Sequence, residues 1–263
     1  MSNPTRPTAL VTGASAGIGK SFATHLARTG HDLVLVARRA DRLEAIAGEL
    51  CEAHDVVVEV LTADLAAPEG VAVVEARLAE GDPIDLFVNN AGFAARGAVG
   101  DLDLDALESM IRVNVLAFSR LANAAAARMR KEGRGTIINV GSGTLFMQFA
   151  GNAGYGATKA FVAYFTRSMQ LDLADSGVRV QLLIPGVIAT EFHQIAGNPI
   201  ENFPPERVMQ ADDLVVASLR ALEMEEPVCI PSLPDISDWD AYVAAEAKIA
   251  PNSSRDRIAD RYH

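Results

Sequence analysis

Short apolar runs alternate with longer amphipathic segments along nearly the whole chain. Apolar runs this short and rich in β-branched residues are typical of strands buried on both faces of a sheet. Alternating strands and helices predict a parallel sheet with helices on both faces, and right-handed crossovers give it a doubly wound topology. The expected strands are Thr8–Thr12, Asp32–Ala37, Val56–Leu61, Ile84–Asn89, Thr136–Val140, Val178–Ile184 and Val228–Ile230. The expected helices are Ile18–Arg28, Arg42–His54, Gly70–Ala79, Leu104–Lys131 (two helices in series), Tyr155–Asp175 and Asp212–Leu222.

The length and composition are those of one large globular domain. The 263 residues include 49% hydrophobic and 22% charged side chains, a balance that excludes wholesale disorder. No linker rich in Gly, Ser or Pro divides the chain, so we expect a single α/β Rossmann domain over residues 1–263, with a mostly parallel seven-stranded sheet. A proline-bearing segment at about 187–210 follows a strand, as a lid over a ligand does. Residues from about 235 to 263 form a C-terminal extension.

Charge and cysteine content exclude several classes of function. The formal net charge is −11, whereas nucleic-acid binders and polybasic membrane-surface proteins carry basic patches. No apolar run approaches the roughly 18 residues of a membrane span, and Met1–Thr8 lacks the apolar core of a signal peptide. With only Cys51 and Cys229 and five dispersed histidines, the sequence predicts no disulfide framework and no metal site. We therefore expect a cytoplasmic protein without nucleic-acid or membrane partners.

A glycine-rich turn lies between the first expected strand and the first expected helix. It reads Thr12-Gly13-Ala14-Ser15-Ala16-Gly17-Ile18-Gly19. Glycines at such a turn let the backbone bend sharply and approach a pyrophosphate, which the free N–H groups of the following helix then bind. The turn indicates a dinucleotide site, although glycines at strand–helix turns also serve packing alone.

Two other motifs overlap the same turn. Gly13-Ala14-Ser15-Ala16-Gly17 fits the G-x-S-x-G nucleophile elbow, which would make Ser15 the nucleophile of an α/β-hydrolase. That interpretation needs a downstream histidine, and His193 is the only one in the second half of the chain before the C-terminal residue. Gly19-Lys20-Ser21 resembles the end of a phosphate-binding loop, but the glycine that this motif requires at position 14 is an alanine.

Two arginines stand at the end of the second expected strand. About twenty residues after the glycines, a dinucleotide site carries either an acid for the ribose 2′-hydroxyl or an arginine for a 2′-phosphate. Arg38 and Arg39 occupy this place, and no acid does. A guanidinium binds a phosphate through paired charge-assisted hydrogen bonds, so the sequence favours NADP(H) as the cofactor.

A tyrosine and a lysine four residues apart, Tyr155 and Lys159, share one face of an expected helix. A tyrosine titrates near pH ~10, and a neighbouring ammonium favours its phenolate form. We expect Lys159 to lower the pKa of Tyr155 toward the working range of a general acid and base. Ser142 follows the fifth strand, where its hydroxyl can hold a carbonyl oxygen. Taken singly, a Tyr–Lys pair is more often a surface contact, and a loop serine more often a turn residue.

Together these motifs resemble those of the short-chain dehydrogenase/reductase family, from about Pro7 to Leu233. The matching residues are Thr12-Gly13-x-x-x-Gly17-Ile18-Gly19, Asp64-Leu65, Asn89-Asn90-Ala91-Gly92, Asn114, Ser142, Tyr155-x-x-x-Lys159 and Pro185-Gly186 with Thr190. One departure is Gly141 before Ser142, where many members of the family have a second serine.

The resemblance implies a role for each matching residue. Tyr155 would be the general acid/base, Ser142 would orient the substrate carbonyl, and Lys159 would hydrogen-bond the nicotinamide ribose. Asn114 would position a water that links Lys159 to solvent. The cofactor site that the family implies comprises Gly13, Ser15, Gly17, Ile18, Gly19, Arg38, Asp64, Leu65, Asn90, Gly92, Tyr155, Lys159, Pro185, Gly186, Ile188 and Thr190.

The implied function is hydride transfer between NADP(H) and a carbonyl or secondary alcohol of a small substrate. Ser15 and Arg38 would meet the 2′-phosphate, so Ser15 gains a role without the histidine that a hydrolase requires. Phenylalanines near the expected site predict an apolar, aromatic or alicyclic ketone or aldehyde, unless several of them only pack the lid. Arg96, Gln148 and His193 are candidates for contact with a polar group on the substrate.

An NADP-binding sensor without turnover is the alternative function. It would be indicated by a broken Ser–Tyr–Lys set, and the set here is intact. The family also implies a homodimer or homotetramer, with Leu104–Lys131 and Tyr155–Asp175 forming a helix-pair interface.

Overall fold

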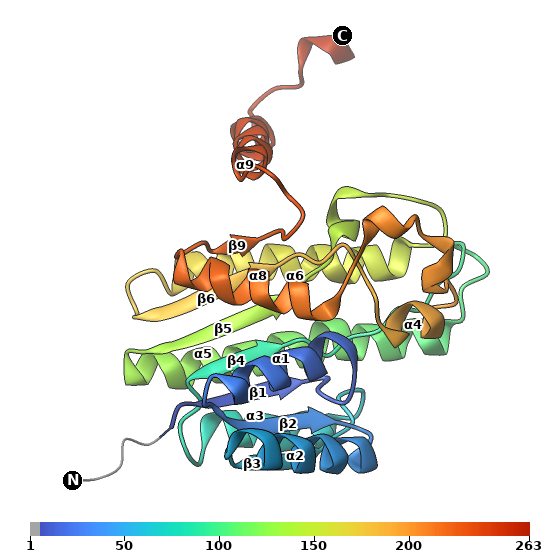
Figure 1. Ribbon diagram of the computed structural model, residues 1–263. Helices are drawn as coiled ribbons and strands as arrows, with labels where there is room; N and C mark the ends of the chain where they lie inside the picture. Colours follow the sequence, from blue (N-terminus) through green and yellow to red (C-terminus); the bar gives the residue numbers. More distant parts are fainter. Residues whose placement is uncertain (1–5) are drawn as a thin grey trace. The chain divides into compact units, whose positions relative to one another are not determined.

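The computed structural model describes residues 6–263, which divide into a compact unit ending at residue 231 and a second unit of residues 232–263. Residues 1–5 of the expected domain lie outside the described residues. The first unit contains a seven-stranded sheet in the order β3-β2-β1-β4-β5-β6-β9, with every neighbouring pair parallel. The doubly wound Rossmann topology is thus confirmed (Figure 1). Its strands are β1 (Thr8–Thr12), β2 (Asp32–Ala37), β3 (Val58–Thr62), β4 (Leu86–Asn89), β5 (Gly135–Val140), β6 (Val178–Leu183) and β9 (Val228–Cys229).

Alternate side chains of the central strands are buried in two separate hydrophobic cores, because successive side chains of a strand point to opposite faces of the sheet. In β1, Val11 belongs to one core and Leu10 to the other; in β2, Leu35 and Val34 divide in the same way. These side chains are fully or almost fully buried. Burial on both faces explains why the strands are recognisable as uninterrupted apolar runs.

Helices cover both faces of the sheet (Figure 1). The first core packs β1 and β2 against α1 (Gly17–Arg28), α2 (Ala40–His54) and α8 (Ala211–Glu223). The second core packs the sheet against α3 (Pro68–Ala79), α5 (Phe118–Glu132) and α6 (Ala153–Asp172). Phe22 of α1 and Leu121 of α5 are completely buried, and each such side chain stabilises the fold by about 1.5–3 kcal/mol.

The expected pair of helices in series is α4 (Leu104–Ile111) and α5, joined by a π-helical turn, η1 (Arg112–Ala117). Asp103 caps α4, because its carboxylate accepts hydrogen bonds from the backbone N–H groups of Asp105 and Ala106 at 3.0 and 3.2 Å. A π turn inside an otherwise α-helical segment commonly marks a functional position. Here it carries Asn114.

The segment after β6 returns across the carboxyl edge of the sheet. Its two short strands, β7 (Val187–Ile188) and β8 (Val208–Met209), pair with each other, and between them lie α7 (Glu191–Ile195), η3 (Ile200–Asn202) and η4 (Pro205–Arg207). We call residues 187–210 the substrate loop. A further 3-10 turn, η2 (Gly143–Phe146), follows β5.

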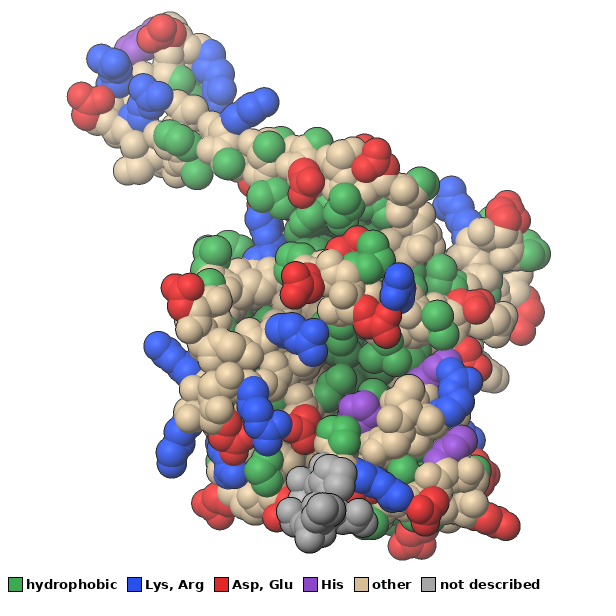
Figure 2. Space-filling model, turned by 60° about the vertical axis from the view of Figure 1, so that its left-hand side comes forward, with side chains coloured by type: hydrophobic (Ala, Val, Ile, Leu, Met, Phe, Trp, Pro, Cys, Tyr) green, Lys and Arg blue, Asp and Glu red, His purple; other side chains and the backbone are tan. Residues whose placement is uncertain are grey.

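The second unit is made of one helix and two short turns: α9 (Ser237–Ile249), η5 (Ala250–Asn252) and η6 (Asp260–Tyr262). Trp239 stacks on Tyr242 within it, with ring centroids 5.4 Å apart. No helix among residues 6–263 is long and apolar enough to span a membrane. Lys and Arg side chains are interspersed with Asp and Glu on the face drawn in Figure 2.

Candidate active site

The glycine turn forms a backbone cradle at the start of α1. Gly13 has φ +69°, a conformation that L-residues with side chains rarely adopt. A Cβ at Gly19 would lie 2.3 Å from the carbonyl oxygen of Gly13, so the turn closes only with glycine at both places. The helix begins without a side-chain cap and without an acidic residue in its first turn. Its free N–H groups and positive dipole end therefore fit the pyrophosphate of a dinucleotide.

Thr12 joins the ends of β1 and β4 beside this cradle. Its hydroxyl accepts hydrogen bonds from the N–H groups of Asn90 and Ala91 at 3.0 and 3.1 Å, and the Asn90 amide donates to the Thr12 carbonyl at 2.8 Å. Asn90 is thereby fixed against the glycine turn, since a Cβ on Gly13 would lie 2.7 Å from its Nδ2. Sequence reasoning assigned Asn90 to the cofactor site but gave Thr12 no role of its own.

Arg39, rather than Arg38, contacts the glycine turn. The Arg39 guanidinium donates two hydrogen bonds to Ser15 Oγ, at 3.2 and 3.0 Å, and pairs with Glu191 at 2.6 Å. Arg42 binds the second carboxylate oxygen of Glu191 at 3.0 Å. The hydrogen bond from Arg39 is the main cause of the lowered pKa of Glu191. Arg38 is exposed.

The contacts of Arg39 argue against the hydrolase interpretation of Ser15 and add Glu191 to the residues near the glycine turn. The Ser15 hydroxyl is held by an arginine and by no histidine among the described residues, so the hydrolase alternative has no support. Glu191 was missed from the sequence because 152 residues separate it from Arg39. Through its ion pairs with Arg39 and Arg42, Glu191 joins α7 of the substrate loop to the start of α2.

Tyr155 and Ser142 meet at the carboxyl edge of the sheet, Tyr155 from the first turns of α6 and Ser142 from the end of β5. The Ser142 hydroxyl acts on the phenol of Tyr155 and lowers its pKa. Tyr155 is buried, and burial raises its pKa to about 12 against the opposing effects of the Ser142 hydrogen bond and the Arg96 charge. The expected lowering of the Tyr155 pKa by Lys159 is therefore wrong for the chain alone, because desolvation of the phenolate outweighs the nearby charges.

Lys159 lies behind Tyr155 on the same helix face, as the four-residue spacing predicts. Its Nζ is 6.0 Å from the centre of the Tyr155 ring and donates a hydrogen bond to the carbonyl oxygen of Val140 at 2.8 Å. The side chain is buried without a carboxylate partner among the described residues, and desolvation lowers its pKa to about 8. Lys159 can thus release and take up a proton near neutral pH.

Asn114 is locked in place beside Lys159. Its amide donates hydrogen bonds to the Phe93 carbonyl at 2.9 Å and to Thr158 Oγ1 at 3.1 Å, and its Oδ1 accepts from the Phe93 N–H. A Cβ on Gly92 would lie 3.0 Å from Asn114 Oδ1 and 3.6 Å from Lys159 Nζ. The two side chains therefore both approach the backbone of Gly92. The water expected between Asn114 and Lys159 stays a prediction.

The remaining predicted residues border the same edge. Thr190 packs on the glycine turn, since a Cβ on Gly17 would lie 3.0 Å from its methyl carbon. The Pro185 carbonyl accepts a hydrogen bond from the Gly143 N–H at 2.7 Å, which ties the segment after β6 to the Ser142 loop. Asp64 is exposed while Leu65 is buried in the second core. Gly186 is exposed, and Ile18 and Ile188 pack against the first core.

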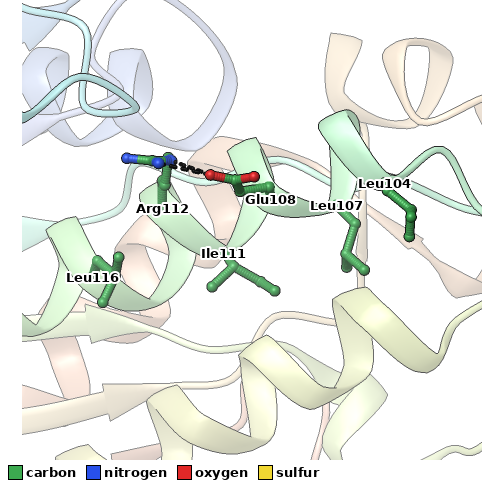
Figure 3. Close-up of a pocket in the computed structure, with 6 residues that line it drawn as sticks. All are labelled: Leu104, Leu107, Glu108, Ile111, Arg112 and Leu116. Atoms are coloured by element: carbon green, nitrogen blue, oxygen red, sulfur yellow. Dashed lines mark hydrogen bonds and ion pairs between the residues drawn. The ribbon is translucent and has the colours of Figure 1, made fainter.

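A shallow groove on α4 and η1 lies outside this set of residues. Its lining is Leu104, Leu107, Glu108, Ile111, Arg112 and Leu116. Leu107 and Ile111 point toward α6, and Glu108 pairs with Arg112 (Figure 3). None of these residues was predicted to bind cofactor or substrate.

The buried ammonium of Lys159 predicts a measurable pH dependence of stability. Its pKa is about 8 in the folded chain and 10.5 ordinarily, so between these pH values the unfolded chain binds more protons and stability rises with pH. The unfolding free energy of wild type relative to Lys159→Met should rise by about 3 kcal/mol from below pH 8 to above 10.5, because each pKa unit contributes about 1.36 kcal/mol. Urea unfolding across this range measures it. The exposed Lys131→Met variant is the control, and a difference that stays flat or falls contradicts the burial of a charged Lys159.

Comparison with known proteins identifies the family to which this site belongs. Residues 7–199 match the family model described as short chain dehydrogenase. The chain belongs to the short-chain dehydrogenase family. It is an oxidoreductase acting on CH–OH or C=O groups, as the sequence predicted.

Three relatives illustrate the likeness. A short-chain dehydrogenase from Sphingobium yanoikuyae in complex with NADPH is 41% identical, with a TM-score of 0.93 over 98% of this chain and 100% of that one. The bulky-bulky ketone specific alcohol dehydrogenase from Comamonas testosteroni is 37% identical, with a TM-score of 0.88 over 97% and 98%. An NADP-dependent 3-hydroxy acid dehydrogenase from Schizosaccharomyces pombe is 34% identical over 85% of this chain and 89% of its own length.

Proposed function

We propose that this short-chain dehydrogenase is an NADP(H)-dependent carbonyl reductase in which Tyr155 is the proton donor. The observation that carries the proposal is the buried Tyr155 side chain, whose pKa Ser142 affects and whose ring centre lies 6.0 Å from Lys159 Nζ. Because its pKa is raised to about 12, the phenol keeps its proton at neutral pH. A protonated phenol suits the reduction of a ketone, in which the developing alkoxide takes up a proton.

NADP(H) fits the backbone cradle and the positive charge near it. The glycine turn packs so closely that a Cβ on Gly19 would meet the Gly13 carbonyl oxygen. Helix α1 begins after it without a side-chain cap, so its N–H groups are available to a pyrophosphate. Ser15, Arg38 and Arg39 offer a hydroxyl and two guanidinium groups for a 2′-phosphate. When bound, the cofactor carries the hydride that passes to or from the substrate carbon. Two of the relatives described above bind or depend on NADP(H).

The protein's own side chains bind the carbonyl oxygen and supply the proton. Ser142 and Tyr155 donate hydrogen bonds to the carbonyl oxygen, where negative charge develops. Tyr155 gives up its proton to that oxygen. Lys159, with its pKa near 8, and Asn114 lie on the route by which a proton returns to Tyr155 through water.

The substrate proposed is a ketone with an apolar substituent. Phe192 lies against the Tyr155 ring, with centroids 5.7 Å apart, and Phe203 lies beyond His193 on the substrate loop. Phe146, Met147 and Phe149 after β5 are exposed apolar side chains. A relative that acts on bulky-bulky ketones is consistent with this lining.

Cofactor choice is tested by titrating NADPH and NADH into variants of the two arginines. Arg38→Ala and Arg39→Ala should each weaken NADPH binding by roughly tenfold or more, because a charge-assisted hydrogen bond to phosphate is lost. NADH binding should change less than about threefold in both. Arg120→Ala, whose guanidinium pairs with Glu75, is the matched control. Equal losses for the two cofactors, or tighter NADH binding by wild type, would contradict the proposal.

We also propose a cytoplasmic homodimer or homotetramer. Leu104 and Leu116 of the α4–η1 face are exposed, as are Phe161 and Tyr164 of α6. A second copy of the chain would cover these apolar side chains together with the groove in Figure 3. Both cysteines are free, which supports a reducing compartment.

A further inference from the structure

Arg96 is a partly buried guanidinium without a partner. Among residues 6–263, no hydrogen bond or ion pair is found for its side chain, and its Nε is inaccessible to solvent and unsatisfied. Other arginines near the site, such as Arg39 and Arg42, are paired with a carboxylate. A charged group removed from water without a partner is costly. Arg96 is therefore suited to an anion that is not part of the chain.

Three buried polar atoms without a partner belong to segments that neighbour Tyr155. Within residues 6–263, the buried side-chain atoms without a partner are Arg96 Nε, Asn152 Oδ1 and His193 Nδ1. Asn152 is the residue before α6 and lies three positions from Tyr155 in the chain. His193 is the neighbour of Phe192, whose ring lies against that of Tyr155.

The backbone around Arg96 brings it to the same place. The N–H of Gly97 donates to the Gly151 carbonyl at 3.2 Å, so the residues after Arg96 and before Asn152 are tied together. Ala95, on the other side of Arg96, packs against the cluster that contains Tyr155. Desolvation lowers the pKa of His193, and the Arg96 charge lowers it further. Desolvation raises the pKa of Tyr155, and the same charge is one of the effects that oppose this rise. The Gly97–Gly151 hydrogen bond and the packing of Ala95 thus bring the segment that carries Arg96 close to Tyr155.

We propose that Arg96 binds a carboxylate on the substrate, so that the enzyme acts on oxo acids and the corresponding hydroxy acids. A carboxylate presents two oxygens in the plane that matches a guanidinium fork. The His193 imidazole can donate a further hydrogen bond to the carboxylate from Nδ1. Asn152 can do so only through its Nδ2 amide, because its Oδ1 is an acceptor. The apolar remainder of the acid lies against Phe192 and its neighbours. This inference rests on the proposed function and specifies its substrate class.

The test compares each acid with its methyl ester, which has the same reacting carbon but no charge. The substrates are phenylglyoxylate with NADPH and 3-hydroxy-3-phenylpropanoate with NADP⁺, each beside its ester. Arg96→Gln should lower the acid-to-ester ratio of kcat/KM by roughly 10- to 100-fold, mainly through KM for the acid. Arg220→Gln, on the exposed face of α8, should leave the ratio as in wild type. A ratio for Arg96→Gln within twofold of wild type overturns the proposal.

A binding measurement separates this inference from the proposed function. Benzoate and benzamide are titrated into the enzyme with NADPH bound, and the Kd for NADPH shows that each variant is folded. Arg96→Gln should weaken benzoate binding at least tenfold more than benzamide binding. If neither the acids nor the esters are turned over, the proposed function is wrong. The benzoate titration still measures whether Arg96 binds a carboxylate. Equal binding of benzoate by wild type and Arg96→Gln, or no benzoate binding to either, overturns the carboxylate site.

Discussion

Replacement of Tyr155 by phenylalanine should lower kcat by about 10²- to 10⁴-fold, the usual contribution of a positioned general acid. The phenylalanine ring retains the packing against Phe192 and loses only the hydroxyl that Ser142 contacts. The NADPH Kd should therefore stay within about threefold of the wild-type value. Stopped-flow measurement of NADPH oxidation under single-turnover conditions, together with fluorescence titration, checks both parts.

The matched control for this variant is Tyr164→Phe. Tyr164 lies on the same helix as Tyr155 but is 76% exposed, so loss of its hydroxyl should leave kcat within twofold of wild type. A Tyr155→Phe enzyme with wild-type turnover would remove the proton-donor role and with it the central argument for reduction.

Replacement of Gly19 by alanine should abolish useful cofactor binding. The added Cβ would lie 2.3 Å from the Gly13 carbonyl oxygen and 2.8 Å from the Asn90 amide, and this amide is held by its hydrogen bond to the Thr12 carbonyl. Either the turn opens or α1 shifts, so NADPH should bind at least about 100-fold more weakly. The free energy of unfolding should fall by about 1–3 kcal/mol, as for other overpacked sites.

Gly48→Ala provides the comparison for a glycine that has space. Gly48 is also in a helix, and a Cβ there would meet nothing within 4 Å. This variant should keep wild-type NADPH affinity and gain up to about 1 kcal/mol in stability from helix propensity. If both alanine variants bind NADPH alike, the tight approach within the glycine turn has no role in holding the cofactor.

The sheet and the cofactor cradle could be predicted from the sequence because both depend on local patterns. Strands buried on two faces have apolar residues at consecutive positions, as residues 9–11 of β1 and 33–37 of β2 do. A strand–glycine–helix turn is likewise encoded in consecutive residues. Tyr155 and Lys159 meet because four residues make about one helical turn.

The electrostatics of the site could not be predicted in the same way. The direction of the Tyr155 pKa depends on how deeply the ring is buried, and the Tyr–Lys spacing carries no information about burial. Contacts between distant segments were also missed. Arg39 reaches Ser15 and Glu191 across three parts of the chain, whereas the sequence favoured its neighbour Arg38 for the same place.

The Glu191 bridge has a consequence for loop exchange between relatives. Its carboxylate neutralises the same Arg39 that contacts Ser15, yet Glu191 belongs to the substrate loop. A graft of this loop from another dehydrogenase, made to change which ketone is accepted, would also remove the counter-charge of Arg39 next to Ser15. If the proposed roles of Arg39 and of the loop hold, coenzyme preference and substrate range would change together in such a chimaera.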